Sequence, residues 1–291
     1  MAVPQLAITP ALKRQLGLWL DEDLGRGDLS AVCLCSDVVE AHWVAKAPGV
    51  FAGGVLAAAV FQQLDAQVQV QQLVADGEPV VAGQRLLNLT GGAPALVGAE
   101  RTALNLAMRL SGIATATAAL VAELQGSGIQ LADTRKTTPG LRALEKYAVR
   151  CGGGQNHRLG LDDAAMLKEN HLAWAGGMDA AVAAVRSQAP WPARVIIEAE
   201  TAAEATAAVN AGADGVLLDE FSPDELRELV PQLRQLASQR GSAVVLEASG
   251  IQPQQLSHFC DTGIDLISTS APVTRSAWLD VSMRFSPRQE G

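Results

Sequence analysis

The chain is poor in aromatic residues and lacks the long apolar run that a membrane helix needs. Only 4% of its 291 residues are aromatic, whereas 48% are hydrophobic, so we expect an alanine-rich core of the kind found in packed α/β layers. The longest weakly polar run, residues 49–61, is far shorter than the ~20 residues that span a bilayer. The amino terminus has no basic segment leading into an apolar run, so no signal peptide is expected. These absences predict a soluble, cytoplasmic protein with no membrane partner.

Positive charge and cysteine are also scarce. The formal net charge is −9, and no extended basic stripe is present, so nucleic acid is not expected as a partner. The four cysteines (Cys33, Cys35, Cys151 and Cys260) form no C-x-x-C pair and show no metal-ligand spacing. Cys33 and Cys35 are therefore interpreted as reduced thiols, and we assign them no role.

The first part of the chain has the texture of an α+β layer of roughly 105 residues. Thr9 and Pro10 precede an amphipathic segment and predict a capped helix that runs to Leu24. After this helix, three strands (38–46, 68–74 and 84–90) and a second helix (55–64) are predicted, separated by Gly/Pro turns. Residues 94–125 are expected to be mostly helical, with a break at Ser111-Gly112.

From Gly128 onward, short apolar strands alternate with alanine-rich helices such as 201–211 and 223–237. Buried strands with helical crossovers indicate a parallel sheet, and continuous β-α repetition favours closure into a barrel. Only about six units fit, fewer than the eight of the common (β/α) barrel. An open doubly wound sheet is the alternative, but no G-x-G-x-x-G follows a first strand. The predicted strands are 129–132, 165–168, 194–198, 215–219, 243–247 and 265–268.

Each of these strands ends in residues capable of chemistry, and the carboxyl ends of barrel strands carry the active site. Between Asp133 and Arg158 the acidic chain holds six Lys/Arg against two Asp/Glu, together with His157 and a Gly-Gly-Gly turn. Such a cluster suits a small polyanion. Three of its cations at helical spacing are interpreted instead as a solvated helix face: Arg142, Lys146 and Arg150.

The residue types at the strand ends divide the chemistry between them. Arginines present planar forks to carboxylates, lysines are point charges suited to phosphate, and paired acids suit Mg²⁺ or sugar hydroxyls. A salt bridge to Lys168 is the alternative for the acids. A turn of small polar residues can hold phosphate with its backbone N–H groups. In this order the residues are Arg101, Arg135 and Arg158; Lys136 and Lys168; Glu198 and Asp219; and Ser249, Gly250 and Ser268 to Ala271.

These residues lie in segments that resemble the quinolinate phosphoribosyltransferases over nearly the whole chain. The most specific segments are D-T-R-K-T-T-P-G-L-R (133–142) and Y-A-V-R-C-G-G-G-Q-N-H-R-L-G-L (147–161). Others are E-D-L-G-R-G-D-L-S (22–30), E-R-T-A-L-N-L (100–106), L-S-G-I-A-T (110–115), L-K-E-N-H (167–171), G-A-D-G-V-L-L-D-E (212–220), T-G-I-D-L-I-S (262–268) and L-D-V-S-M-R-F (279–285).

The resemblance implies an α/β sandwich domain (1–107), an incomplete six-stranded, TIM-like α/β barrel (108–279) and a carboxyl-terminal segment (280–291) that returns to the first domain. It also implies a homodimer with shared active sites. The expected reaction joins quinolinate and phosphoribosyl pyrophosphate, with Mg²⁺, to give nicotinate mononucleotide, pyrophosphate and CO₂.

The resemblance also assigns roles. Arg135, His157 and Arg158 hold the quinolinate carboxylates, with Thr134 and Lys168 beside them and Arg101 reaching in from the other subunit. Lys136 meets pyrophosphate, and Glu198 and Asp219 hold ribose hydroxyls and Mg²⁺. Lys136, Lys168, Glu198 and Asp219 are thus the catalytic candidates. The residues that bind the 5′-phosphate of phosphoribosyl pyrophosphate are Ser249, Gly250, Ser268, Ser270 and Ala271.

The sequence departs from the family pattern at three places. The loop Ser249-Gly250-Ile251 is one residue shorter, residues 269–273 (T-S-A-P-V) replace a glycine-containing turn, and Ile196 stands where an outer Glu is common. A lost glycine removes close backbone approach, and a proline removes an N–H donor. Three alternatives therefore stay open: a molybdate-operon relative of the same fold, a Schiff-base aldolase using Lys136 or Lys168, and a non-catalytic quinolinate sensor.

Overall fold

The computed structural model describes residues 4–34 and 37–286, so Cys35 lies outside the described residues. The chain divides into two compact units. The first comprises Met1–Ala118, Leu144–Gly153 and Arg275–Gly291, and the second comprises Ala119–Ala143 and Gly154–Thr274. Compared with the predicted boundaries at 107 and 279, the first unit additionally takes most of one helix from the middle of the chain, α4 (Arg142–Cys151).

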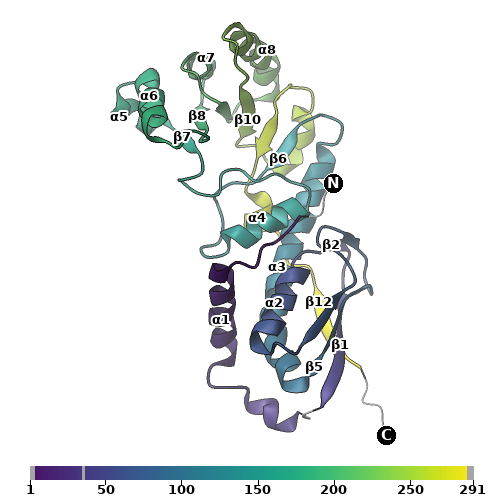
Figure 1. Ribbon diagram of the computed structural model, residues 1–291. Helices are drawn as coiled ribbons and strands as arrows, with labels where there is room; N and C mark the ends of the chain where they lie inside the picture. Colours follow the sequence, from purple (N-terminus) through teal and green to yellow (C-terminus); the bar gives the residue numbers. More distant parts are fainter. Residues whose placement is uncertain (1–3, 35–36, 287–291) are drawn as a thin grey trace. The chain divides into compact units, whose positions relative to one another are not determined.

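The first unit contains a four-stranded antiparallel sheet in the order β12-β1-β5-β3 (Figure 1). Helices α1 and α2 accompany this sheet, and Thr9 Oγ1 caps α1 by accepting a hydrogen bond from Leu12 N. The two helices and three strands predicted here are confirmed, and Trp43 and Phe61 pack edge to face at the centre of the core. The elements are α1 (Pro10–Leu24), η1 (Leu29–Cys33), β1 (Val38–Ala45), β2 (Gly49–Val50), α2 (Gly54–Leu64), β3 (Gln69–Gln72), β4 (Pro79–Val80), β5 (Arg85–Gly92) and β12 (Val281–Phe285).

The predicted break at Ser111-Gly112 is wrong, because α3 (Ala93–Glu123) is continuous. Both residues serve packing instead. The Ser111 hydroxyl is buried and hydrogen-bonds to the N and O atoms of Ala52. A Cβ on Gly112 would come within 2.1 Å of the Ala277 carbonyl oxygen. A small polar pair inside a helix therefore marks a close approach of backbone rather than an end.

Helix α3 is also the one helix of the described residues that is long and apolar enough to cross a membrane, a possibility that the run at 49–61 did not reveal. By length and composition alone this is weak evidence, since 44% of its most apolar window is buried inside the protein. A core helix passes the same test, and the packing of Ser111 and Gly112 gives α3 that role in the first unit.

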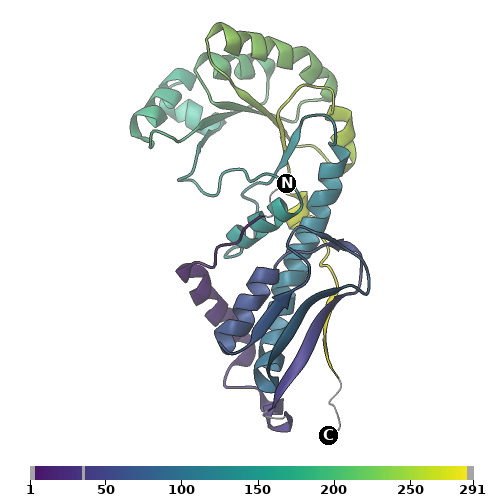
Figure 2. The same ribbon diagram turned by 45° about the vertical axis from the view of Figure 1, so that its right-hand side comes forward.

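The second unit is built on a six-stranded parallel sheet in the order β6-β11-β10-β9-β8-β7. In the described residues β6 and β7 are edge strands, so the barrel is incomplete, as predicted. Figure 2 shows the helices along the outer side of the curved sheet. The elements are β6 (Gln130–Ala132), β7 (Ala165–Leu167), α5 (Glu169–Ala175), α6 (Met178–Gln188), β8 (Val195–Ala199), α7 (Ala202–Asn210), β9 (Gly215–Asp219), α8 (Pro223–Gln239), β10 (Val245–Ser249), η2 (Pro253–Phe259), β11 (Leu266–Ser268) and α9 (Ala271–Arg275).

Alternation along the strands separates two faces of this sheet. Val195, Ile197 and Ala199 of β8 belong to the apolar core, as do Val216 and Leu218 of β9, and all are at most 1% exposed. The intervening residues, such as Glu198 and Asp219, point to the other face. That interior face therefore carries polar side chains, while the outer face is sealed by helices.

Five of the six barrel strands lie within one residue of their predicted bounds, but the fifth was predicted two residues too early. It was predicted at 243–247 and lies at Val245–Ser249. Asp214 and Asp265, just before β9 and β11, accept backbone hydrogen bonds from Val195 and Leu246 and so help to fix where the neighbouring strands begin. As a result Glu247 is a mid-strand residue, two positions before the strand end.

Candidate active site at the carboxyl ends of the barrel strands

Two cationic segments of the sequence, residues 133–136 and 156–158, meet at the edge of the sheet formed by β6. Gln155 runs alongside β6 as an isolated parallel bridge to Ala132. The Gln155 N donates to Leu131 O over 2.7 Å, and Asp133 N donates to Gln155 O over 3.1 Å. These bonds bring residues 156–158 beside the end of β6, where Asp133 begins the other cationic segment.

Asp133 joins the two segments through its side chain. It is 1% exposed, and its carboxylate accepts hydrogen bonds from Asn156 Nδ2 (2.7 Å) and His157 N (2.8 Å). A second connection is the Arg142 guanidinium, which donates to Thr137 Oγ1 and to Leu159 O. Asp133 was not among the predicted site residues, although its position as the first residue of the segment 133–136 could have indicated a role.

The predicted carboxylate-binding arginines lie near each other. Burial lowers the pKa of the Arg158 guanidinium, and the positive charge of Arg135 lowers it further. Arg158 is anchored through Nη1, which donates to Ala164 O over 3.0 Å, while Arg135 and Lys136 are exposed. Thr134 Oγ1 accepts from Lys136 N over 3.0 Å and so shapes this turn. Two like charges held together favour the arrival of an anion.

Carboxylates and hydroxyls occupy the neighbouring strand ends on the interior face. Glu198 of β8 forms an ion pair with Lys168, the residue that caps α5, so the salt-bridge alternative applies to Glu198. Asp219 of β9 instead accepts a hydrogen bond from the Ser249 hydroxyl of β10. The register pairs Ser249 with Asp219 and Ser268 with Ala132 at the end of β6.

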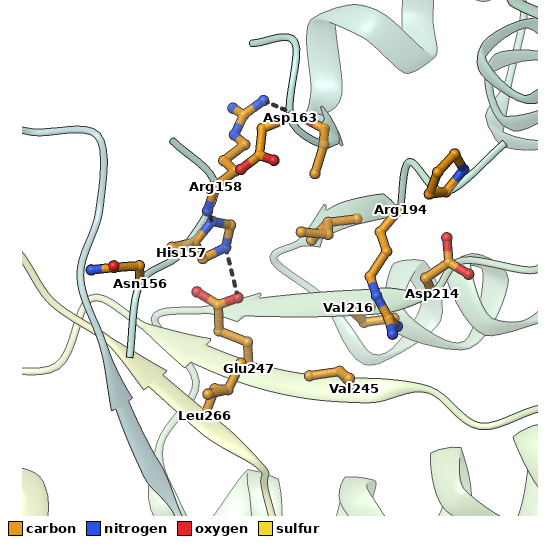
Figure 3. A pocket seen from close by; sticks show the side chains of 14 residues that line it. Asn156, His157, Arg158, Asp163, Arg194, Asp214, Val216, Val245, Glu247 and Leu266 are labelled. Atoms are coloured by element: carbon orange, nitrogen blue, oxygen red, sulfur yellow. Dashed lines mark hydrogen bonds and ion pairs between the residues drawn. The ribbon is translucent and has the colours of Figure 1, made fainter. Parts of the chain in front are cut away.

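A cavity of about 420 Å³ lies inside the second unit and extends below His157 and Arg158 toward the amino ends of β8 and β9 (Figure 3). Its lining includes the apolar residues Ile196, Val245 and Leu266. Arg194 and Asp214 lie on the side away from His157 (Figure 3). Glu247 rises from β10 toward His157, and its Oε2 lies 3.1 Å from His157 Nε2. Glu247 was not among the predicted site residues, because its contact with His157 joins positions 90 residues apart in sequence.

The two altered loops have definite structures. Gly250 has φ +79°, and a Cβ there would lie 2.9 Å from Glu220 Cγ. Glu220 itself has φ 59°, a region that favours glycine. At the other loop, Ala271 N donates to Thr269 Oγ1 over 3.2 Å, and Pro272 lies within the short helix α9. Ser249, Ser268 and Ser270 nevertheless leave hydroxyl groups at these strand ends.

Two further predicted residues are placed differently from the rest. Lys146 is 1% exposed, so its interpretation as part of a solvated helix face is wrong, whereas Arg150 of the same helix is exposed. The residues of α4 from Leu144 to Val149 are all buried, and Lys146 is one of them. Arg101 is exposed on α3 in the first unit, whose placement relative to the barrel is not defined.

The donor set fits Mg²⁺ only in partnership with a substrate. No group of three or more His, Cys, Asp or Glu residues in positions 4–34 and 37–286 could hold a metal ion. Glu198 and Asp219 offer two carboxylates on one face. Mg²⁺ is commonly held by one or two carboxylates together with substrate phosphates and water. These two residues are therefore compatible with a substrate-bridged Mg²⁺.

The fold and the site together define an incomplete α/β-barrel protein whose strand ends gather cations, acids and hydroxyls. Sequence comparison then gives the family. Residues 28–111 match the N-terminal domain of quinolinate phosphoribosyl transferase, and residues 113–284 match its C-terminal domain. The chain belongs to this family.

Individual relatives match along almost their whole length. The chain is 42% identical over 284 residues to a probable nicotinate-nucleotide pyrophosphorylase [carboxylating] of Synechocystis, covering 97% of this chain and 94% of the relative. It is 38% identical to the human nicotinate-nucleotide pyrophosphorylase [carboxylating], covering 93% and 90%. The solved nicotinate-nucleotide pyrophosphorylase of Francisella tularensis superimposes with a TM-score of 0.88 at 34% identity, covering 98% and 99%.

Proposed function

We propose that this protein transfers the phosphoribosyl group of phosphoribosyl pyrophosphate to quinolinate with loss of CO₂, giving nicotinate mononucleotide and pyrophosphate. The observation that carries the proposal is the meeting of residues 133–136 with residues 156–158, within a chain that belongs to this family throughout. The reaction is a pentosyl transfer of NAD biosynthesis. Nothing observed favours the molybdate-operon relative or the Schiff-base aldolase.

Quinolinate carries two carboxylates on adjacent ring atoms, and we assign these to Arg135 and Arg158. Their mutual repulsion, seen in the lowered pKa of Arg158, is relieved when a dianion binds between them. We assign Thr134, His157 and Lys168 to the surroundings of the same carboxylates, and Arg101 of a second subunit to complete the site. The homodimer is thus part of the proposal.

Phosphoribosyl pyrophosphate would lie across the carboxyl ends of β8 to β11. Glu198 and Asp219 would face the ribose, and Lys136 the pyrophosphate. The 5′-phosphate would meet Ser249, Gly250, Ser268, Ser270 and Ala271. When bound, Mg²⁺ would neutralise charge on the leaving pyrophosphate, held by Glu198 and Asp219 together with the substrate.

The chemistry then needs orientation and charge rather than a covalent nucleophile. The pyridine nitrogen forms a bond to the anomeric carbon as the bond to pyrophosphate breaks. Positive charge develops at that carbon, and the two carboxylates stabilise it. The 2-carboxyl group leaves as CO₂, its bonding electrons stay at ring carbon 2 beside the positive nitrogen, and a proton takes its place.

The cytoplasmic location expected from the sequence also belongs to this proposal. Cys33, Cys151 and Cys260 are free thiols, which is in keeping with a reducing compartment.

An end-point assay with quinolinate, phosphoribosyl pyrophosphate and Mg²⁺, following nicotinate mononucleotide and CO₂ together, tests the proposal. We expect both products in equal amounts and only when all three components are present, with EDTA abolishing them. If calorimetry detects quinolinate binding but no product forms, the protein is a sensor and the transferase proposal fails.

A further inference from the structure

Glu247 is, like Asp133, a buried acid of the barrel. Its side chain is 4% exposed, compared with 16% for Glu198. Within the described residues its Oε1 atom has no hydrogen-bond partner, although the atom is inaccessible to solvent. A buried carboxylate with one unsatisfied oxygen is costly. An apolar residue at this position would avoid that cost, so stability does not account for the carboxylate.

The contacts of His157 supply a functional reason. Its Nδ1 accepts a hydrogen bond from Arg158 N over 2.7 Å, so Nδ1 carries no proton in this arrangement. The ring proton is then on Nε2, which donates to Glu247 Oε2 over 3.1 Å. The partner of one imidazole nitrogen fixes the tautomer at the other. Carboxylate, imidazole and the backbone of Arg158 thus form one chain of hydrogen bonds.

This chain ends at a residue that we assign to substrate. The His157 N is separately held by Asp133, so the segment from Asn156 to Arg158 is anchored from the β6 side by Asp133 and from the β10 side by Glu247. Figure 3 shows Glu247 and His157 facing each other at the upper boundary of the cavity, with Arg158 directly beyond His157.

We propose that Glu247 is a positioning residue, which fixes His157 in the Nε2–H tautomer and through it sets the place of Arg158 for a substrate carboxylate. The part concerning substrate rests on the proposed function, whereas the part concerning the tautomer does not. Glu247 acts through His157 and need not touch quinolinate.

Three variants separate the hydrogen bond from charge and from packing. Glu247→Gln removes the charge but keeps an oxygen that accepts from Nε2–H. Glu247→Leu removes both, and Glu247→Met is the substitute if the leucine variant fails to fold. Asp261→Asn is the control, because Asp261 is a carboxylate of the same unit that pairs with Arg227 on the surface.

The first readout is the ¹⁵N spectrum of ring-labelled histidine, which distinguishes the protonated from the unprotonated ring nitrogen. The chain has only four histidines, and His157→Asn assigns the signal. We expect the Nε2–H form in the wild type and in Glu247→Gln. In Glu247→Leu the ring loses its acceptor at Nε2 and can turn away from the Arg158 N–H, so we expect a mixture of tautomers. An unaltered His157 signal in Glu247→Leu would overturn the assignment of the tautomer to Glu247.

The second readout is kinetic. In Glu247→Leu we expect the KM for quinolinate to rise about tenfold, as for other residues that orient a ligand through a histidine. The KM for phosphoribosyl pyrophosphate and the Tm should stay unchanged, and Glu247→Gln and Asp261→Asn should behave like the wild type. An unchanged KM for quinolinate in Glu247→Leu, or equal losses in the Gln and Leu variants, would overturn the positioning role.

The two proposals fail separately. A wild type that makes no product contradicts the proposed function, and calorimetric quinolinate binding then replaces the KM as the readout. The tautomer in Glu247→Leu is decided by the spectrum in either case.

Discussion

At the scale of single residues, Arg135 offers a direct test of the site, because its guanidinium is exposed and acts on Arg158 through its positive charge. In Arg135→Ala a quinolinate carboxylate would lose its bidentate partner, and we expect kcat/KM to fall by an amount equivalent to about 2–4 kcal/mol. Arg227→Ala is the control, because Arg227 pairs with Asp224 and Asp261 on the surface. Wild-type kcat/KM in Arg135→Ala would remove Arg135 from the site.

Cys151 lies in the same sequence segment (147–161) as His157 and Arg158, but its environment is different. Burial raises the pKa of its thiol to about 12, and the nearby Asp76 carboxylate adds to the shift. Because the thiolate is the reactive form, the fraction of reactive Cys151 at pH 8 is very small. We expect iodoacetamide to modify exposed Cys33 rapidly and Cys151 only after unfolding, as read by peptide mass spectrometry. Equal rates for the two thiols in the native protein would contradict this environment.

The residue types of the site could be predicted from the sequence, but the packing contacts around it could not. The sequence predicted that cations at 133–136 and 156–158 would act together, and the bridge at Gln155 brings them side by side. The Gly-Gly-Gly turn was interpreted as an approach of backbone to substrate. Gly152, however, packs in the first unit, where a Cβ would lie 2.4 Å from the Ala114 carbonyl oxygen. Composition cannot distinguish a glycine needed for packing from one needed for binding.

Among the elements, α3 differs most from its prediction, and the difference has a measurable consequence. Alanine is favoured over glycine inside a helix by about 1 kcal/mol, yet at Gly112 a Cβ would meet the Ala277 carbonyl. We expect Gly112→Ala to lower the free energy of unfolding by about 1–3 kcal/mol through overpacking, measured by urea denaturation.

Gly17 of α1 provides the matched helix position with room. A Cβ there would meet nothing closer than Gln63 Nε2 at 3.9 Å, so Gly17→Ala should raise the stability by up to about 1 kcal/mol. If Gly112→Ala also stabilised the protein, the close approach of residues 112 and 277 would be wrong.

The strands and helices followed from periodicity, but strand register did not. N-cap residues such as Thr9 of α1 and Ser222 of α8 indicate in the sequence where these helices start. The start of β10 depends on Asp265, nineteen residues from Leu246 in sequence. A single sequence carries little information on such pairings, and a shift of two residues keeps the same side chains on the interior face. That is why the error left the fold intact.

At the scale of the whole molecule, the proposal requires Arg101 of one subunit to serve the barrel of another. Arg101 is exposed on α3 of the first unit, while Lys168 pairs with Glu198 in the second. In a dimer that mixes Arg101→Ala with Lys168→Ala subunits, a shared site would be restored at one of the two barrels. The other barrel would carry both substitutions. If both residues served their own subunit, neither barrel would be intact.

Random mixing of equal amounts makes about half of the dimers mixed, and one barrel of each would be active. We therefore expect about a quarter of the wild-type activity after subunit exchange, and none in either variant alone or immediately after mixing. Differently tagged subunits and tandem purification isolate the mixed dimer, whose activity should approach half of the wild-type value. An inactive purified mixed dimer would show that Arg101 does not act across the interface, because a shared site necessarily leaves one complete barrel in it.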